Sequence, residues 1–153
     1  MYRFLLVVSL ACLVAAYFSG GGLLAASANV DLLGPDANHD GVRDDIEAYI
    51  DKAYTDQAHR NAALQAARAM QGVFVVDLDD PLAVRQVNRL LARADQCIYQ
   101  VFRDANATKP AAQVSSELEA MAVNTKQRLH RYLDFNKALD GAIWSQSRGD
   151  SCE

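Results

Sequence analysis

Apolar residues recur at helical spacing along most of the chain from residue 44 onward. Spacings of three and four residues place such side chains on one face of a helix. The first stretch of this kind covers residues 44–54, and an alanine-rich stretch over residues 56–71 follows it. We expect Thr55 to cap the second stretch and Gly72 to end it. The two stretches form either two helices or one kinked helix.

Residues 73–76 read Val-Phe-Val-Val, a run too short and isolated to predict a sheet. We interpret it as an apolar connector laid on the core, with a short strand as the alternative. Asp80 before Pro81 predicts a helix start, because the aspartate caps free amides and proline lacks only an N–H that the first helical position does not use. Apolar residues from Val84 to Val101 then follow a three-four spacing. This helix is expected to be the central one.

The pattern downstream predicts a turn over residues 106–110 and a further helical region around Leu118. Asn124 and Thr125 either interrupt that region or begin a new helix. The apolar stripe continues to Gly141, which is the expected C-terminal cap. The sequence therefore predicts an all-α fold, a small helical bundle of four to five helices.

The first residues are typical of an export signal. Arg3 gives a positive start, an uncharged and mostly apolar stretch over residues 4–18 follows, and Ala26-Ser27-Ala28 has the small-x-small pattern that signal peptidase accepts. We expect a cleavable signal peptide over residues 1–28 and a single domain over residues 29–153. The alternative is an uncut membrane anchor over residues 4–26. Either way the domain is expected to be periplasmic or secreted.

Composition narrows the class of partner. The chain has 153 residues, which allows one compact domain, and 15 Lys and Arg stand against 19 Asp and Glu for a net charge of -4. This balance provides no basic field for a nucleic-acid backbone. Nucleic acid is therefore not an expected partner, and a membrane is one only if the signal segment is uncut.

The cysteines agree with export. Cys12 belongs to the signal segment, which leaves Cys97 and Cys152 to form a disulfide in an oxidising compartment. The bridge would close a loop of about 56 residues, and the chain-entropy estimate for its stabilisation is roughly 4 kcal/mol. The alternative is two unpaired thiols. A Cys-x-x-Cys pair and a Cys/His cluster of zinc spacing are both missing from the sequence, so redox and zinc roles have no support.

Residues 36–47 carry the most specific chemistry in the chain. They read Asp-Ala-Asn-His-Asp-Gly-Val-Arg-Asp-Asp-Ile-Glu, with oxygen-bearing side chains at positions 1, 3, 5, 9 and 12 and Gly41 at position 6. Calcium takes about six to eight oxygen ligands, and alternating acceptors on a curled backbone supply them without distant parts of the chain. Glycine in the middle permits the sharp turn that this curl needs.

This pattern resembles the EF-hand loop and, more closely, the bacterial single-loop relatives found in dockerin and thrombospondin type 3 repeats. The resemblance covers these twelve residues only. The order of a loop of this kind followed by helices is also similar to that of small exported bacterial proteins. It implies one Ca²⁺ ion held by a defined ligand set. The ligands would be Asp36, Asn38 and Asp40 through side chains, Val42 through its carbonyl, Asp44 directly or through water, and Glu47 through both carboxylate oxygens.

The charges around the loop favour cation binding, but the sequence departs from the full EF-hand pattern. Seven acidic residues lie between residues 31 and 51, against Arg43 as the single base. An ordinary acidic turn before a helix N-terminus is the alternative interpretation. The departures from the EF-hand pattern are three. Arg43 replaces the aliphatic residue of position 8, and residues 33–35 interrupt any entering helix. A second loop is missing from the sequence. We therefore expect weak binding, in roughly the 0.1 to 1 mM range, with calcium as a structural staple and His39 as a solvated loop residue.

Recognisable catalytic motifs are missing from the sequence, so an enzyme is not expected. We expect His59 and His130 to lie at the core edge or the surface. The final segment is the best candidate for a partner surface, because Arg, Tyr and Trp are common interface anchors; an ordinary amphipathic helix with its aromatic side chains in the core is the alternative. The residues concerned are Arg128, His130, Arg131, Tyr132, Phe135 and Trp144.

The sequence is thus interpreted as an exported calcium-binding helical protein that serves as a protein-binding or structural module. Its partner is expected to be a macromolecule, most simply another protein. The alternative function is a periplasmic hydrolase, or its accessory subunit, with an unrecognised active site.

Overall fold

The computed structural model describes residues 32–103, 107–139 and 150–153, and within these ranges the chain forms helices and no strands. The prediction of a small all-α bundle is confirmed. The helices are α2 (Asp44–Ala53), α3 (Gln57–Val75), α4 (Pro81–Val101), α5 (Ala111–Ala122) and α6 (Lys126–Ala138).

Several sequence-based predictions lie outside the described residues. These are the signal peptide over residues 1–28, the alternative anchor over residues 4–26, the cap at Gly141 and the surface position of Trp144. In the part of the chain that is described, no helix combines the length and the apolar character needed to span a bilayer.

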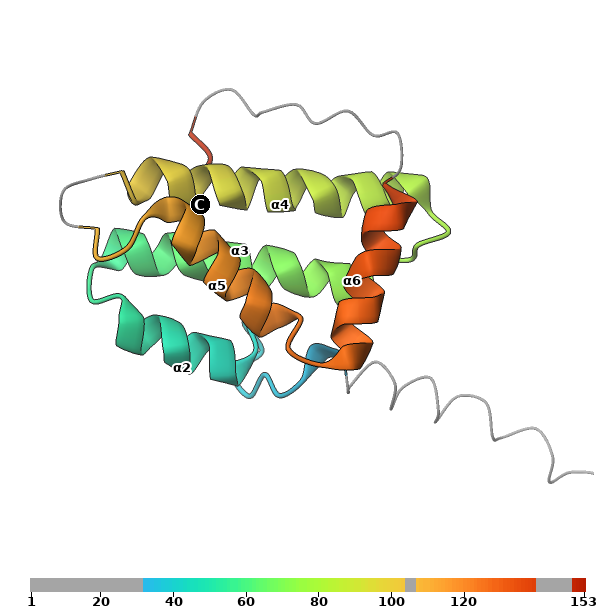
Figure 1. The fold of residues 1–153 in the computed structure, drawn as a ribbon, viewed down its shortest axis with the longest axis horizontal. Coiled ribbons are helices and arrows are strands. Elements are labelled where there is room, and N and C mark those ends of the chain that lie inside the picture. Colours follow the sequence, from blue (N-terminus) through green and yellow to red (C-terminus); the bar gives the residue numbers. More distant parts are fainter. Residues whose placement is uncertain (1–31, 104–106, 140–149) are drawn as a thin grey trace, which may run out of the picture.

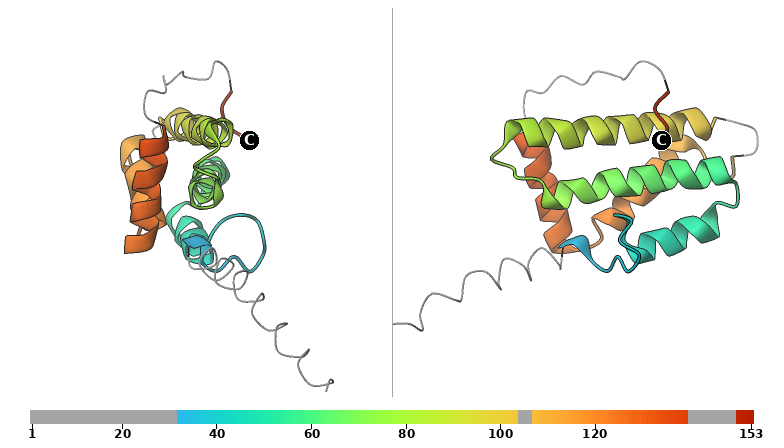
Figure 2. Two further views of the ribbon diagram at one scale, coloured as in Figure 1. Left: turned by 90° about the vertical axis from the view of Figure 1, so that its right-hand side faces the viewer. Right: turned by 180° about the vertical axis from the view of Figure 1, so that it is seen from behind.

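The helices form two layers. Helices α2, α3 and α4 lie side by side in one layer, and α5 and α6 cover one face of it (Figures 1 and 2). The middle helix is α3, which packs against each of the other four. The prediction that the helix starting at Pro81 is central is therefore wrong. Small buried side chains at Ala62, Ala63 and Ala67 let neighbouring helices approach α3 closely on several sides.

The C-terminal end of α3 also differs from the prediction. The helix continues through Gly72 to Val75, so both the connector and the short-strand interpretations of this run are wrong. A β-carbon at Gly72 would lie 3.4 Å from a methyl group of Val87 on α4, which is an ordinary van der Waals contact. The following Val73 and Phe74 are buried in the core. Burial of this apolar turn outweighs the weak helix propensity of glycine and valine.

Capping hydrogen bonds confirm the predicted helix start at Asp80 and decide between the two alternatives at Thr125. The carboxylate of Asp80 accepts from the amides of Leu82 and Ala83 at the start of α4. The hydroxyl of Thr125 accepts from the amide of Arg128, so Thr125 begins a new helix, α6, after α5 has ended. Each cap satisfies amides that have no partner inside the helix.

The start of α3 lies one residue later than predicted. Its cap is Asp56, whose carboxylate accepts from the amide of His59 at 3.0 Å, and Thr55 lies outside the helix. The preceding helix ends at Ala53, and Tyr54 is extended. The two helices are therefore separate, and the alternative of one kinked helix is wrong.

The predicted disulfide between Cys97 and Cys152 is present. It joins the C-terminal residues to α4, and Figure 1 shows this end of the chain lying beside that helix. The carbonyl of Ser151 accepts hydrogen bonds from Gln65 Nε2 at 2.9 Å and from Arg93 Nε at 3.2 Å. Residues 150–153 are thus attached to both α3 and α4.

Candidate metal centre

Residues 36–47 form a curled loop that leads directly into α2. Residues 32 and 33 are helical, and the chain turns away from this helical direction at Gly34, where φ is 74°. Within the loop, His39 and Gly41 have φ values of 57° and 83°. The predicted role of Gly41 in a sharp turn is confirmed, because this backbone region strains residues that carry a β-carbon.

The side chains at the first, third and fifth positions of the loop point to its own backbone. The carboxylate of Asp36 accepts from the amides of Asp40 at 3.2 Å and Gly41 at 3.0 Å. The Asn38 side-chain oxygen also accepts from the Asp40 amide, at 3.1 Å. Asp40 in turn accepts from the amide of Val42 at 2.8 Å. These hydrogen bonds hold the curl of the loop backbone.

A second set of contacts brings the two ends of the loop together. The side-chain nitrogen of Asn38, Nδ2, donates to both carboxylate oxygens of Glu47, at 3.1 and 3.2 Å. The Asp44 carboxylate accepts from the amide of Ala37 at 2.9 Å. The six predicted ligand positions therefore lie in one closed loop, although they are separated by up to eleven positions in the sequence.

These oxygens are not arranged as a formed metal site. In the described ranges, no group of three or more His, Cys, Asp or Glu side chains is placed to hold a metal ion. The carboxylates accept from loop amides, and Glu47 is bound by the side-chain nitrogen of Asn38. Ligation through Glu47 and the Asn38 oxygen thus requires the Asn38 amide to turn over and release the carboxylate. Metal ligation by these residues would therefore need local rearrangement of their side chains.

Arg43, at position 8, attaches the loop to the bundle. Its side chain is 2% exposed and donates to the carbonyls of Met121 at 2.8 Å and Ala122 at 3.4 Å, at the end of α5. It also forms an ion pair with Asp45, and the hydrogen bond from Arg43 lowers the pKa of that carboxyl. The buried guanidinium is therefore paired and hydrogen-bonded, as a buried charge must be to remain ionised.

Sequence reasoning identified Arg43 only as a departure from the EF-hand pattern. The departure is itself the signal, because a cation at a position normally occupied by an aliphatic residue needs a polar partner outside the loop. Which carbonyls supply that partner depends on how α5 packs, and no local pattern encodes this packing.

Side chains from α3 and α6 hold further carbonyls of this region. Arg68 Nε donates to the Asp40 carbonyl at 2.9 Å, and Gln71 Nε2 donates to the Leu33 carbonyl at 3.3 Å. From α6, Arg128 Nε donates to the Leu32 carbonyl at 2.7 Å. The loop is thus fixed to α3 through Arg68 and to α5 through Arg43, and the residues just before the loop are fixed to α3 and α6.

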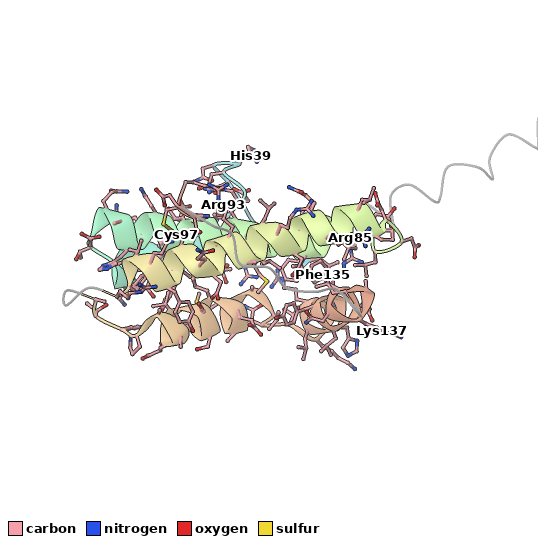
Figure 3. The ribbon with its side chains drawn as sticks, turned by 90° about the horizontal axis from the view of Figure 1, so that it is seen from above. His39, Arg85, Arg93, Cys97, Phe135 and Lys137 are labelled. Carbon is pink, nitrogen blue, oxygen red and sulfur yellow. A yellow bond between two sulfur atoms is a disulfide. The ribbon has the colours of Figure 1, made fainter. Side chains whose placement is uncertain are left out.

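His39 does not take part in these contacts. It is exposed, and Figure 3 shows it at the edge of the molecule. The prediction of a solvated loop residue is confirmed. His59, in contrast, is 4% exposed and stacks on Phe102 with ring centroids 4.4 Å apart, which is the expected position near the core.

The predicted partner surface at the end of the chain is largely used inside the fold. Arg128 is 7% exposed and Phe135 is 1% exposed. Arg131 donates to the backbone carbonyls of Val73 and Val76. These residues are thus wrong as partner anchors, because the helix uses them to bind its neighbours. His130 is exposed and Tyr132 is half-buried.

Comparison of the chain with protein-family models, with curated proteins and with solved structures finds no match. The proposed function therefore rests on the residues of the loop and on their contacts with the bundle.

Proposed function

We propose that the protein is an exported calcium-binding helical protein in which one Ca²⁺ ion stabilises the loop of residues 36–47. The single observation that carries this proposal is the backbone curl, with positive φ at His39 and Gly41 and with Asp36 bound to the amides of positions 5 and 6. The ligand set is the one implied by the resemblance: Asp36, Asn38, Asp40, Val42 carbonyl, Asp44 and Glu47.

Charge supports a cation in this loop. Asp45 is neutralised by Arg43, which leaves Asp36, Asp40, Asp44 and Glu47 to share a twelve-residue segment. A divalent cation offsets the repulsion among these carboxylates. Calcium suits the loop better than magnesium, since it tolerates irregular oxygen geometry and readily gives up water.

The contacts of the loop support a structural role for the ion. Arg43 and Arg68 connect the loop to α5 and α3, so ordering the loop also stabilises the packing of those helices. A single loop of this kind is expected to bind in roughly the 0.1 to 1 mM range of extracellular modules, where the ion serves as a structural part. The disulfide supports export, because such bonds persist in oxidising compartments.

We further propose that the stabilised bundle is a binding or structural module for another protein. Its described surface exposes several large apolar side chains on α4 and α6, which are candidate contact residues. These are Leu82, Leu90, Tyr99, Leu129 and Leu133.

The test is thermal unfolding with calcium and with chelator. For a Kd of about 0.5 mM, about 5 mM calcium adds about 1.4 kcal/mol to the free energy of unfolding. Asp40→Ala removes a ligand and should abolish this shift. Asp134→Ala, which changes an exposed residue of α6, should retain it. The proposal fails if calcium leaves the wild-type Tm unchanged, or if the shift persists in Asp40→Ala.

A further inference from the structure

A cavity of about 310 Å³ lies among α3, α4, α5 and α6, and it shares no residue with the loop of residues 36–47. Its volume is at the lower end of the range for small-molecule sites, about 300 to 1,000 Å³, and corresponds to roughly ten water molecules. Phe135 lines this cavity, and Figure 3 shows it between α4 and the layer formed by α5 and α6. Most of the lining is apolar, including Ala66, Met70, Leu91, Ala94, Ile98 and Leu118.

One polar side chain of the lining is buried. Asn88 of α4 is 8% exposed, and its side-chain oxygen has no hydrogen-bond partner within the residues that the structure describes. Asn88 occupies a position on the buried face of α4, between Val84 and Leu91, where leucine would complete the apolar stripe. A buried amide without a partner destabilises a fold, and such groups persist where something else supplies the partner. The geometry therefore calls for a hydrogen-bond donor inside the cavity.

The rim of the cavity is acidic. Asp95 and Glu119 are exposed lining residues, and the Ser115 hydroxyl donates to Asp95 at 2.7 Å. The lining contains no Lys, Arg or His. Burial raises the pKa of the Tyr132 phenol, which therefore stays neutral. The cavity thus combines an apolar interior with a negative rim, and this combination favours a cation over an anion.

Spacing along α4 relates the two polar features. Asn88 and Asp95 are seven residues apart, so they lie on the same face of the helix and about 10 Å apart along its axis. A ligand that reaches both needs a donor at its inner end, an apolar body, and a positive charge at its outer end.

We propose that this cavity binds a small amphiphilic amine with a hydroxyl group at the end opposite its ammonium group. The hydroxyl donates to the Asn88 side-chain oxygen, the apolar body contacts Met70 and its neighbours, and the ammonium group lies beside the carboxylates of Asp95 and Glu119. Tyramine has this arrangement of groups and serves as the probe.

Methionine methyl NMR tests the proposal on the full chain. The chain has three methionines, of which Met70 lines the cavity, whereas Met121 lies on α5 outside the lining. Tyramine should shift the Met70 methyl resonance in a saturable way and leave that of Met121 unchanged. Phenethylamine, which lacks the hydroxyl, should bind roughly fivefold more weakly. The anion 3-(4-hydroxyphenyl)propionate should give no saturable shift up to about 10 mM.

Three variants assign the contacts. Asn88→Leu keeps the number and branching of the side-chain heavy atoms and removes the acceptor, so tyramine affinity should fall to that of phenethylamine while the Tm rises. Asp95→Asn should weaken both amines by roughly threefold. Gln86→Leu, at an exposed position of α4 outside the lining, should leave binding unchanged. An unmoved Met70 resonance, equal binding of the propionate, or unchanged tyramine affinity in Asn88→Leu would each overturn the proposal.

Discussion

The guanidinium group of Arg43 donates to the backbone carbonyl of Met121 at 2.8 Å, across 78 positions of the sequence. Carbonyls in the last turn of a helix lack partners within that helix and carry its negative partial charge. Helix α5 has no basic residue of its own in its last turn. Arg43 supplies the missing cation and at the same time holds the loop of residues 36–47 against the bundle.

Arg43→Met should destabilise the protein by about 2 kcal/mol, because it leaves the carbonyls of Met121 and Ala122 without their charged donor. Urea unfolding measures the change. The matched control is Arg85→Met on the exposed face of α4, which should stay within about 0.5 kcal/mol of the wild type. Equal stabilities of the two variants would contradict the role assigned to Arg43.

Two substitutions in the loop should differ in how strongly they change stability. At Gly41, φ is 83° and an added β-carbon would meet the Arg68 side chain at 3.3 Å, so Gly41→Ala should cost about 1 to 2 kcal/mol. His39 has φ of 57° and an exposed side chain, so His39→Gly relieves strain and should change stability by less than about 0.5 kcal/mol. Thermal unfolding in chelator compares them. The interpretation is wrong if His39→Gly is the more damaging change.

The Lys109–Glu117 ion pair predicts a pH dependence of stability. Lys109 Nζ lies 2.6 Å from Glu117 Oε2, and this contact, followed by the Tyr49 and Gln113 hydrogen bonds, lowers the pKa of Glu117 from 4.5 to about 2. A carboxyl group whose pKa is lower in the folded state than in the unfolded state stabilises the protein at pH values above its unfolded-state pKa. This stability should therefore be complete above about pH 4.5 and be lost as the pH falls toward 2.

Solvent screening reduces the size of this effect. The Glu117 side chain is 31% exposed, so we expect about 1 kcal/mol or less. Urea unfolding of wild type and Glu117→Gln at about pH 6 and pH 3 measures it. In a Lys109→Gln background, the same substitution should show a smaller dependence on pH, because the largest cause of the lowered pKa is removed while the Tyr49 and Gln113 hydrogen bonds remain. A pH effect of equal size in both backgrounds would assign the stability to another carboxylate.

Cys152→Ser should lower the free energy of unfolding by roughly 4 kcal/mol, the chain-entropy estimate for a bridge across a sequence separation of 55. Chemical denaturation with and without reductant measures the loss. Reductant should destabilise the wild type by a similar amount and leave Cys152→Ser unaffected. If the variant matches the oxidised wild type, the contacts of Gln65 and Arg93 with Ser151 are sufficient to hold the tail.

The sequence predicts those parts of the fold that depend on neighbouring residues. Asp80 and Pro81 define a helix start whatever surrounds them, and Gly41 indicates a turn because the backbone itself demands it. Gly72 shows the limit of this reasoning. A glycine after an apolar stripe ordinarily ends a helix, whereas here the burial of Val73 and Phe74 carries the helix past it.

The candidate site divides in the same way. The curl of the loop follows from local residues such as Gly41, but its carboxylates are not arranged to hold a metal ion, and the partners of Arg43 and Arg128 depend on distant helices. The cavity at Asn88 could not be predicted either. Its walls come from four helices, and a single asparagine in an apolar stripe does not reveal whether its oxygen has a partner.

The wide sequence separation of the loop contacts has a consequence for the order of folding. Arg43 needs α5, and the Leu32 carbonyl needs Arg128 of α6, 96 positions later. Chains form nearby contacts before remote ones, so the segment that is synthesised first among the described residues should be secured last. Damage to these contacts should then accelerate unfolding and leave the refolding rate almost unchanged.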